Sequence, residues 1–152
     1  MKKTLIIFAL SLGFWACSKT EVQPTPAATT TTNTQTTPPV TTTFSTIGQK
    51  LIAQGTFQNG VHAVSGMVKV YESTEGKRNL VFENFNTTSG PDLRIWVAET
   101  TQGSNYTEIT DKVLGSGNFY FPISSTLDIT KSNQVLIWCK SFAVLFGSAK
   151  LQ

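Results

Sequence analysis

The sequence predicts an all-β fold, an antiparallel β-sandwich or jelly-roll-like barrel of about seven to nine short strands. Two observations support this prediction. Short runs rich in Val, Ile, Phe, Tyr and Trp recur along residues 44–152, and clusters of Gly, Asn, Ser, Thr and Pro separate them. Stretches with the periodicity of an amphipathic helix are scarce in the same region. Together these patterns favour packed sheets over helices.

The strands can be assigned in chain order, because each apolar run ends at a turn cluster such as QNG, STEGKRN or NTTSGPD. The predicted strands are Lys50–Phe57, Val61–Tyr71, Asn79–Phe85, Leu93–Glu99, Asn118–Pro122, Gln134–Lys140 and Val144–Leu151. A short helical turn is expected either at Gln49–Leu51 or at Tyr106–Leu114.

Residues 1–16 predict a signal peptide. Lys2 and Lys3 precede an apolar run, Leu5–Ala16, which is shorter than the roughly 20 apolar residues that a membrane-spanning helix needs. The motif FWAC resembles a relaxed bacterial lipobox, with Phe14 in the position where Leu is usual. We therefore expect cleavage before Cys17 and lipidation of that cysteine. The alternative is an ordinary secretory signal followed by an incidental cysteine.

Residues 17–43 are predicted to form the lipidated cysteine and a tether. From Ser18 to Thr43 the chain contains twelve Thr and four Pro and almost no apolar residues. Such a segment buries too little surface to offset the entropy of ordering, so we expect a disordered, extended linker. The folded domain is then expected at residues 44–152.

The charge balance argues against a nucleic-acid partner. The formal net charge is +3, but Lys2 and Lys3 leave with the signal. The remaining chain has ten Lys and Arg and nine Asp and Glu, so it is nearly neutral. Binding to nucleic acid needs a clustered basic face. The partners that we expect are the membrane, through the lipid on Cys17, and an unidentified redox or protein partner.

Cys139 is the second of only two cysteines and lies in the apolar run NQVLIWCKSF. If Cys17 carries lipid, Cys139 has no partner within the chain, which is uncommon in an oxidising compartment. In a strand, Cys139 shares a wholly apolar face with Val135 and Ile137, and Trp138 points to the opposite face. We expect Cys139 to point into the core or a pocket and Trp138 to be half-covered.

The sequence contains no readable arrangement of nucleophile, base and acid, so a turnover enzyme is not favoured. His62, the single histidine, lies near a turn, where a surface or capping role is usual. Asp92 follows Gly90 and Pro91, a pattern typical of a residue that caps its own backbone in a turn. One His and one Cys cannot form a closed four-ligand zinc site, and no metal site is predicted. A haem needs fewer protein ligands and an apolar pocket.

Several stretches together resemble the electron-transfer DM-thirteen domain family. They are GTFQNGVHAVSGMVKVY, LVFENFNTTSGPDLRIWVA, NFYFPI and VLIWCKSFAVLFGSAKL. The specific feature is the combination of Gly-Pro-Asp-Leu with Trp-Cys-Lys-x-Phe, whereas the loop from Thr100 to Gly117 matches loosely. The matching positions are Gly55, Phe57, His62, Gly66, Phe85, Gly90, Pro91, Asp92, Leu93, Tyr120, Pro122, Trp138, Cys139, Phe142, Phe146 and Ala149.

The resemblance implies an all-β fold and a redox role for Cys139, either as a free thiol or as the ligand of a prosthetic group such as haem. On this hypothesis His62 is a second ligand or base, and Asp92 and Trp138 shape the pocket. The alternative is a non-catalytic β-sandwich displayed for adhesion or partner binding, in which Cys139 is a small core residue. We expect the protein in a bacterial cell envelope, held by lipid, with the outer membrane favoured over the inner.

Overall fold

The computed structural model describes residues 43–152, so the predicted signal, Cys17 and nearly all of the tether lie outside the described residues. The described part is built from strands and turns, with no helix. The strands are β1 Gln49–Asn59, β2 Val64–Ser73, β3 Arg78–Thr87, β4 Leu93–Ala98, β5 Tyr106–Thr110, β6 Ser116–Ile123, β7 Gln134–Cys139 and β8 Val144–Lys150. Accordingly, residues 43–152 include no helix that is long and apolar enough to cross a membrane.

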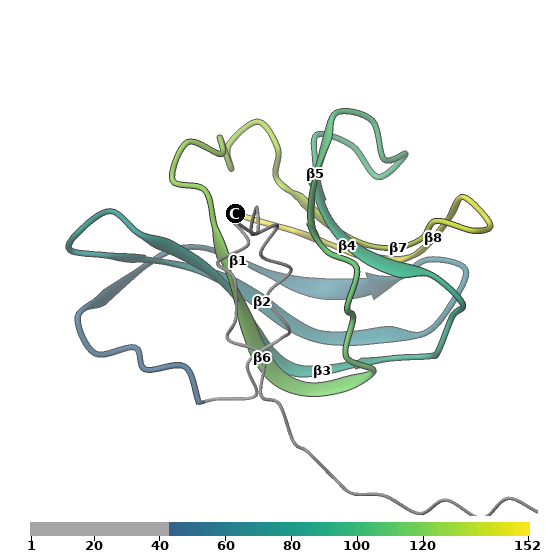
Figure 1. Cartoon of the computed structure of the whole chain (residues 1–152), viewed down its shortest axis with the longest axis horizontal. Helices are drawn as coiled ribbons and strands as arrows, with labels where there is room; N and C mark the ends of the chain where they lie inside the picture. Colours follow the sequence, from purple (N-terminus) through teal and green to yellow (C-terminus); the bar gives the residue numbers. More distant parts are fainter. Residues whose placement is uncertain (1–42) are drawn as a thin grey trace, which may run out of the picture. The chain divides into compact units, whose positions relative to one another are not determined.

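The strands form one antiparallel sheet in the order β5-β4-β7-β8-β1-β2-β3-β6. β1 is the corner of this sheet, because most of it pairs with β2 whereas Phe57–Asn59 pairs with β8. The sheet curls over itself, so that β4, β7 and β8 lie across from β1, β2 and β3 (Figure 1). The inner faces of these two layers enclose the core of a half-barrel.

The prediction of an antiparallel all-β fold is confirmed. Seven of the strands correspond to those assigned from the sequence, with ends that differ by a few residues. The helical turn expected at Tyr106–Leu114 is wrong, because Tyr106–Thr110 forms the edge strand β5 and pairs with β4. The other expected helical turn, Gln49–Leu51, is the beginning of β1. Backbone pairing with the neighbouring strand decides the conformation in both places.

Phenylalanine rings fill the centre of the half-barrel. Phe82 of β3 is fully buried, and its ring centroid lies 4.8 Å from that of Phe119 and 5.5 Å from that of Phe85. Phe57 of β1 packs against both Phe82 and Phe85, and Phe121 of β6 packs against Phe82. Stacked and edge-to-face pairs at these separations are favourable beyond the area that they bury. The rings therefore join β1, β3 and β6.

A β-bulge in β2 depends on glycine. The pairing between β2 and β3 shifts between Ser65 and Met67, and Gly66 between them has a φ of 107°. A Cβ atom at Gly66 would lie 2.7 Å from the carbonyl oxygen of Asn84 and 2.7 Å from the Cα atom of Phe85. Because the two backbones approach so closely, only glycine fits here. Bulges of this kind increase local twist and bend the strand, which helps the sheet to curl.

We expect Gly66→Ala to lower the free energy of unfolding by about 2–4 kcal/mol, because it adds overpacking to backbone strain. Gly76→Ala is the matched control, since Gly76 also has a positive φ of 77° but no atom within 4 Å of an added Cβ. The control should lose only about 1 kcal/mol. Urea denaturation of both variants measures the difference, and equal losses would contradict a close backbone approach at Gly66.

Candidate functional site

Cys139 ends β7 and points into the core. Its side chain is fully buried, with 0% exposed, and it belongs to the same core cluster as Ile137. Within the sheet it lies opposite Leu93 of β4 and Val144 of β8. Residues that lie directly opposite one another share a face of the sheet, so two aliphatic side chains flank the thiol. Cys139 is a free cysteine within the described residues, and its predicted inward orientation is confirmed.

Asp92 fixes the chain beside the end of β7. Its backbone carbonyl accepts a hydrogen bond from the backbone N–H of Lys140 at 2.9 Å. Its carboxylate accepts a second one from Nε of Arg94 at 2.6 Å. Arg94 alternates with the core-facing Leu93, so this carboxylate is engaged on the outer face of the sheet, opposite to the thiol.

Arg94 joins Asp92 to the edge strand β5. Its Nη1 atom donates a hydrogen bond to Oε1 of Glu108 at 3.0 Å and lies 3.9 Å from Oδ2 of Asp111. The hydrogen bond to Asp92 is the main cause that raises the pKa of the Arg94 guanidinium, and the charge on Glu108 acts in the same direction. The guanidinium therefore remains charged and lies within ion-pair distance of the carboxylates of Asp92, Glu108 and Asp111.

His62 lies on the surface, just after β1. Its ring centroid lies 3.9 Å from that of Phe146, and its backbone N–H donates a hydrogen bond to the carbonyl of Phe146 at 3.3 Å. Phe146 is a buried residue of β8 that also meets the Gly90 loop, where an added Cβ would lie 2.9 Å from its ring. Phe146 thus lies against both His62 and the loop that carries Asp92, but the imidazole itself is exposed.

Trp138 points away from Cys139, to the outer face of the sheet. It is half-buried, as predicted, and packs with Trp96, Ala98, Leu136 and Leu145 in a second, smaller apolar cluster. The two tryptophan rings are stacked, with centroids 5.1 Å apart. The four residues predicted for the site are therefore divided between the core, the outer face and the surface.

A cavity of about 420 Å³ lies beside the Gly90 loop. Asp92, Leu93 and Arg94 line one side of it, and the segment 111–113 contributes to its lining. Leu93 is common to the wall of this cavity and to the surroundings of Cys139, because it lies opposite Cys139 in the sheet. Cys139, His62 and Trp138 do not line the cavity.

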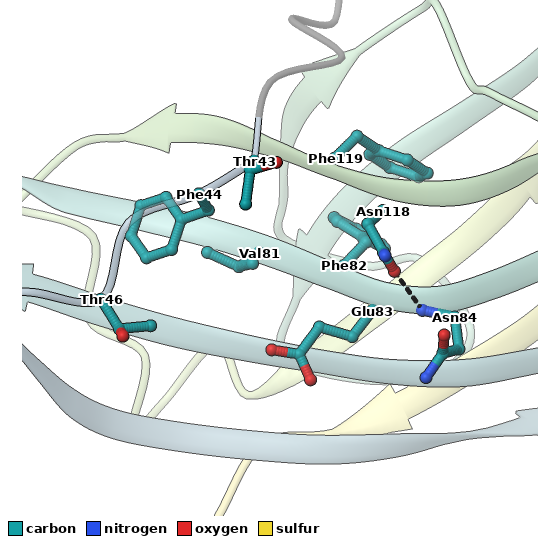
Figure 2. A pocket seen from close by; sticks show the side chains of 9 residues that line it. All are labelled: Thr43, Phe44, Thr46, Val81, Phe82, Glu83, Asn84, Asn118 and Phe119. Atoms are coloured by element: carbon teal, nitrogen blue, oxygen red, sulfur yellow. Dashed lines mark hydrogen bonds between the residues drawn. The ribbon is translucent and has the colours of Figure 1, made fainter.

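A second cavity, of about 360 Å³, is lined by residues 81–84 of β3, by Asn118 and Phe119 of β6, and by Thr43, Phe44 and Thr46. Figure 2 shows Phe44 from the start of the described chain beside Val81, and the side-chain oxygen of Asn118 accepting a hydrogen bond from the backbone N–H of Asn84 at 2.6 Å. The ring of Phe44 also packs against that of Tyr120, with centroids 5.2 Å apart. None of the predicted site residues lines this cavity, which forms where the chain enters the domain.

The haem hypothesis does not fit this arrangement. A haem ligand needs an open apolar pocket around the donor atom. The Cys139 thiol is instead flanked by Leu93 and Val144, and neither Cys139 nor His62 lines the two cavities described above. The geometry favours a free thiol over a bound prosthetic group.

The side chains that surround Trp138 on the outer face were not predicted from the sequence. Trp96 and Tyr106 stack there, and Arg94 and Glu108 form an ion pair beside them. The alternation in DLRIWV does place Arg94 and Trp96 on one face of a strand. Only the pairing of β4 with β7 and β5, which single-strand patterns do not reveal, brings these residues to Trp138.

The electron transfer DM13 family matches residues 56–151, which is more than half of the chain. The chain belongs to the DM13 family. The matched region includes His62, Asp92, Trp138 and Cys139, so the resemblance seen in the sequence is confirmed. No curated protein and no solved structure matches the chain. The description of the family names electron transfer.

We expect Cys139 of the folded chain to resist alkylation by N-ethylmaleimide, because its side chain is fully buried. Labelling followed by peptide mapping should show modification of Cys139 only when denaturant unfolds the domain. The control is Cys139→Ala/Ser141→Cys, which moves the thiol to the exposed turn two residues further on. Labelling of Cys139 in the native chain as fast as in this control would contradict its enclosure.

Proposed function

We propose that this chain is a lipid-anchored protein of the bacterial cell envelope whose DM13 domain transfers single electrons through the thiol of Cys139. One observation carries the proposal. The region that matches an electron-transfer family contains one unpaired cysteine within the described residues, and that cysteine is fully enclosed. An unpaired thiol is uncommon in an oxidising compartment, so its presence there favours a redox role.

The enclosure of Cys139 suits electron exchange better than group transfer. Peroxide attack and thiol–disulfide exchange require a reagent to touch the sulfur atom, which Leu93 and Val144 flank. Transfer of an electron needs no such contact. In the proposed step, the thiol gives one electron to a one-electron acceptor while it is enclosed. Its proton passes to water when the end of β7 opens transiently beside the exposed turn 140–143, leaving a sulfur radical. One electron and one proton from a donor restore the thiol.

Stopped-flow mixing of the purified full chain with hexachloroiridate(IV), an outer-sphere one-electron oxidant, tests the proposed function. We expect the wild-type chain to consume more oxidant than Cys139→Ala, because the thiol is an oxidisable group. Val135→Ala is the matched control, since Val135 is equally buried on the same face of β7. This control should consume as much oxidant as the wild type. Equal consumption by the wild type and Cys139→Ala would overturn the redox role.

The burial of Cys139 also favours a second candidate, a non-catalytic domain displayed for adhesion or partner binding. In that case Cys139 serves as a small apolar residue of the core, a common use of cysteine. The aliphatic neighbours of the thiol agree with this candidate as well as with the first. The oxidant experiment bears on the choice, because a thiol that consumes no oxidant in the folded chain can have only a structural role.

The anchoring part of the proposal rests on the sequence before residue 43. Lys2, Lys3, the short apolar run and the FWAC motif support lipidation at Cys17, and the Thr-rich segment after it supports a tether. A lipid-modified cysteine would hold the domain at the membrane surface while leaving it in the aqueous phase. The outer membrane is the proposed location.

We expect Cys17→Ala to lose labelling by radioactive palmitate, because Cys17 is the proposed site of acylation. The variant should also no longer sediment with the membrane fraction. Cys139→Ala serves as the control and should remain labelled and membrane-bound. Density-gradient separation of the two membranes then reports the location of the wild-type chain. Palmitate incorporation that is unchanged in Cys17→Ala would exclude Cys17 as the anchor.

A further inference from the structure

Three aromatic rings form a stack on the outer face of β4, β5 and β7. Trp96 is at its centre, with its ring centroid 3.7 Å from that of Tyr106 and 5.1 Å from that of Trp138. The interplanar angles are 10° and 19°, so all three rings are nearly parallel. Tyr106, on the edge strand β5, is 45% exposed, whereas Trp96 is only 5% exposed. The stack therefore has its most exposed ring, Tyr106, at the edge of the sheet, its most enclosed ring, Trp96, at the centre, and the half-buried Trp138 at the other end.

The central ring has a proton acceptor in place. The indole Nε1–H of Trp96 donates a hydrogen bond to Oε2 of Glu108 at 3.0 Å. The other carboxylate oxygen of Glu108 accepts a hydrogen bond from Arg94 at 3.0 Å, which fixes the orientation of the carboxylate. An indole that loses an electron becomes strongly acidic at this nitrogen. Glu108 is thus positioned to take the proton when Trp96 is oxidised.

The other end of the stack, the half-buried Trp138, lies on the strand that carries the thiol. Trp138 directly precedes Cys139 in β7, and the two side chains point to opposite faces of the sheet. One strand backbone therefore separates the stacked rings from the enclosed sulfur. The loop before β5 covers the two indoles, because Gly103 lies against both Trp96 and Trp138.

We infer that Trp96, Tyr106 and Trp138 form the electron port of the domain, where a one-electron partner of the outer-sphere type exchanges electrons with the buried thiol. This inference rests on the proposed function of Cys139. It adds the route that the electrons take and the face on which the partner docks. The face is the exposed side of Tyr106 on β5, the most exposed ring of the stack.

The steps balance in atoms and electrons. An oxidant at Tyr106 takes one electron from the stack, and Trp96 passes its indole proton to Glu108, leaving a neutral indolyl radical and a protonated carboxyl group. One electron from Cys139 then reduces the indolyl group while Glu108 returns the proton to it. The thiol proton passes to water when the end of β7 opens transiently beside the turn 140–143. The net result is the loss of one electron and one proton from Cys139, and the stack returns to its initial state.

Flash photolysis of the full chain with a ruthenium(II) polypyridyl complex and an irreversible quencher tests the inference, because it generates a ruthenium(III) oxidant within the solution. All chains carry Trp15→Phe, so that only Trp96 and Trp138 can give the transient absorption of an indolyl radical. We expect this signal in the parent chain and a much smaller one in Trp96→Phe, in which Trp138 is the only remaining tryptophan. Tyr106→Phe should slow its formation, whereas Tyr120→Phe, which alters a tyrosine packed on Phe44 instead, should not.

Glu108→Gln provides a second test of the inference, which is needed if Trp96→Phe disturbs the fold. Glutamine has nearly the same shape and can still accept the indole hydrogen bond, but it is a far weaker base. We expect the neutral indolyl signal to be replaced by that of the indole radical cation. A neutral radical that forms equally fast in Glu108→Gln and in the parent would overturn the role of Glu108 and with it the port.

Cys139→Ala separates the inference from the function on which it rests. We expect a longer-lived indolyl radical in this variant, because no thiol is present to reduce it. If Cys139 is oxidised at the same rate in Trp96→Phe as in the parent, the port is overturned and the redox role of Cys139 stands. If the indolyl radical decays at the same rate in Cys139→Ala and in the parent, the thiol does not give electrons to the stack, and the inference is overturned. Hexachloroiridate consumption then still tests the redox role of Cys139.

Discussion

The position of β7 between β4 and β8 is the constraint on which the rest of this structure depends. A strand paired on both sides and covered on both faces sends alternate side chains into two different environments. Val135, Ile137 and Cys139 enter the core of the half-barrel, while Leu136 and Trp138 join the cluster on the outer face. A register slip of one residue would exchange the two sets, so the same pairing that encloses the thiol also aligns the tryptophan rings.

The outer face adds a charged brace to this arrangement. Arg94 connects Asp92, which precedes β4 and lies beside the end of β7, with Glu108 on the edge strand. Glu108 in turn accepts a hydrogen bond from the indole of Trp96. Ion pairs that are partly exposed contribute little to stability individually. Their effect here is positional, because they hold the edge strand and its exposed Tyr106 against the two tryptophans. In the mechanism that we propose, the brace and the aromatic stack act as one unit.

Sequence patterns were sufficient for the class of fold and for the inward direction of Cys139, because both follow from alternation along single strands. They were insufficient for β5, whose short run YTEIT becomes a strand through pairing with β4. The same limit applies to the site. Trp96, Tyr106 and Trp138 are separated in the chain, and only the non-local pairing of three strands brings their rings together. His62 and Asp92 were identified by motif, but the structure places the imidazole on the surface and the carboxylate against Arg94.

Freeze-quenched electron paramagnetic resonance of the folded full chain, mixed with an outer-sphere one-electron oxidant, tests the central claim most directly. The claim is that the thiol of Cys139 exchanges electrons while it remains enclosed. We predict a sulfur-centred radical in the wild-type chain that is missing from Cys139→Ala, under conditions in which maleimide does not label Cys139. A spectrum without a Cys139-dependent radical, or a radical that appears only where maleimide also reacts, would contradict the claim.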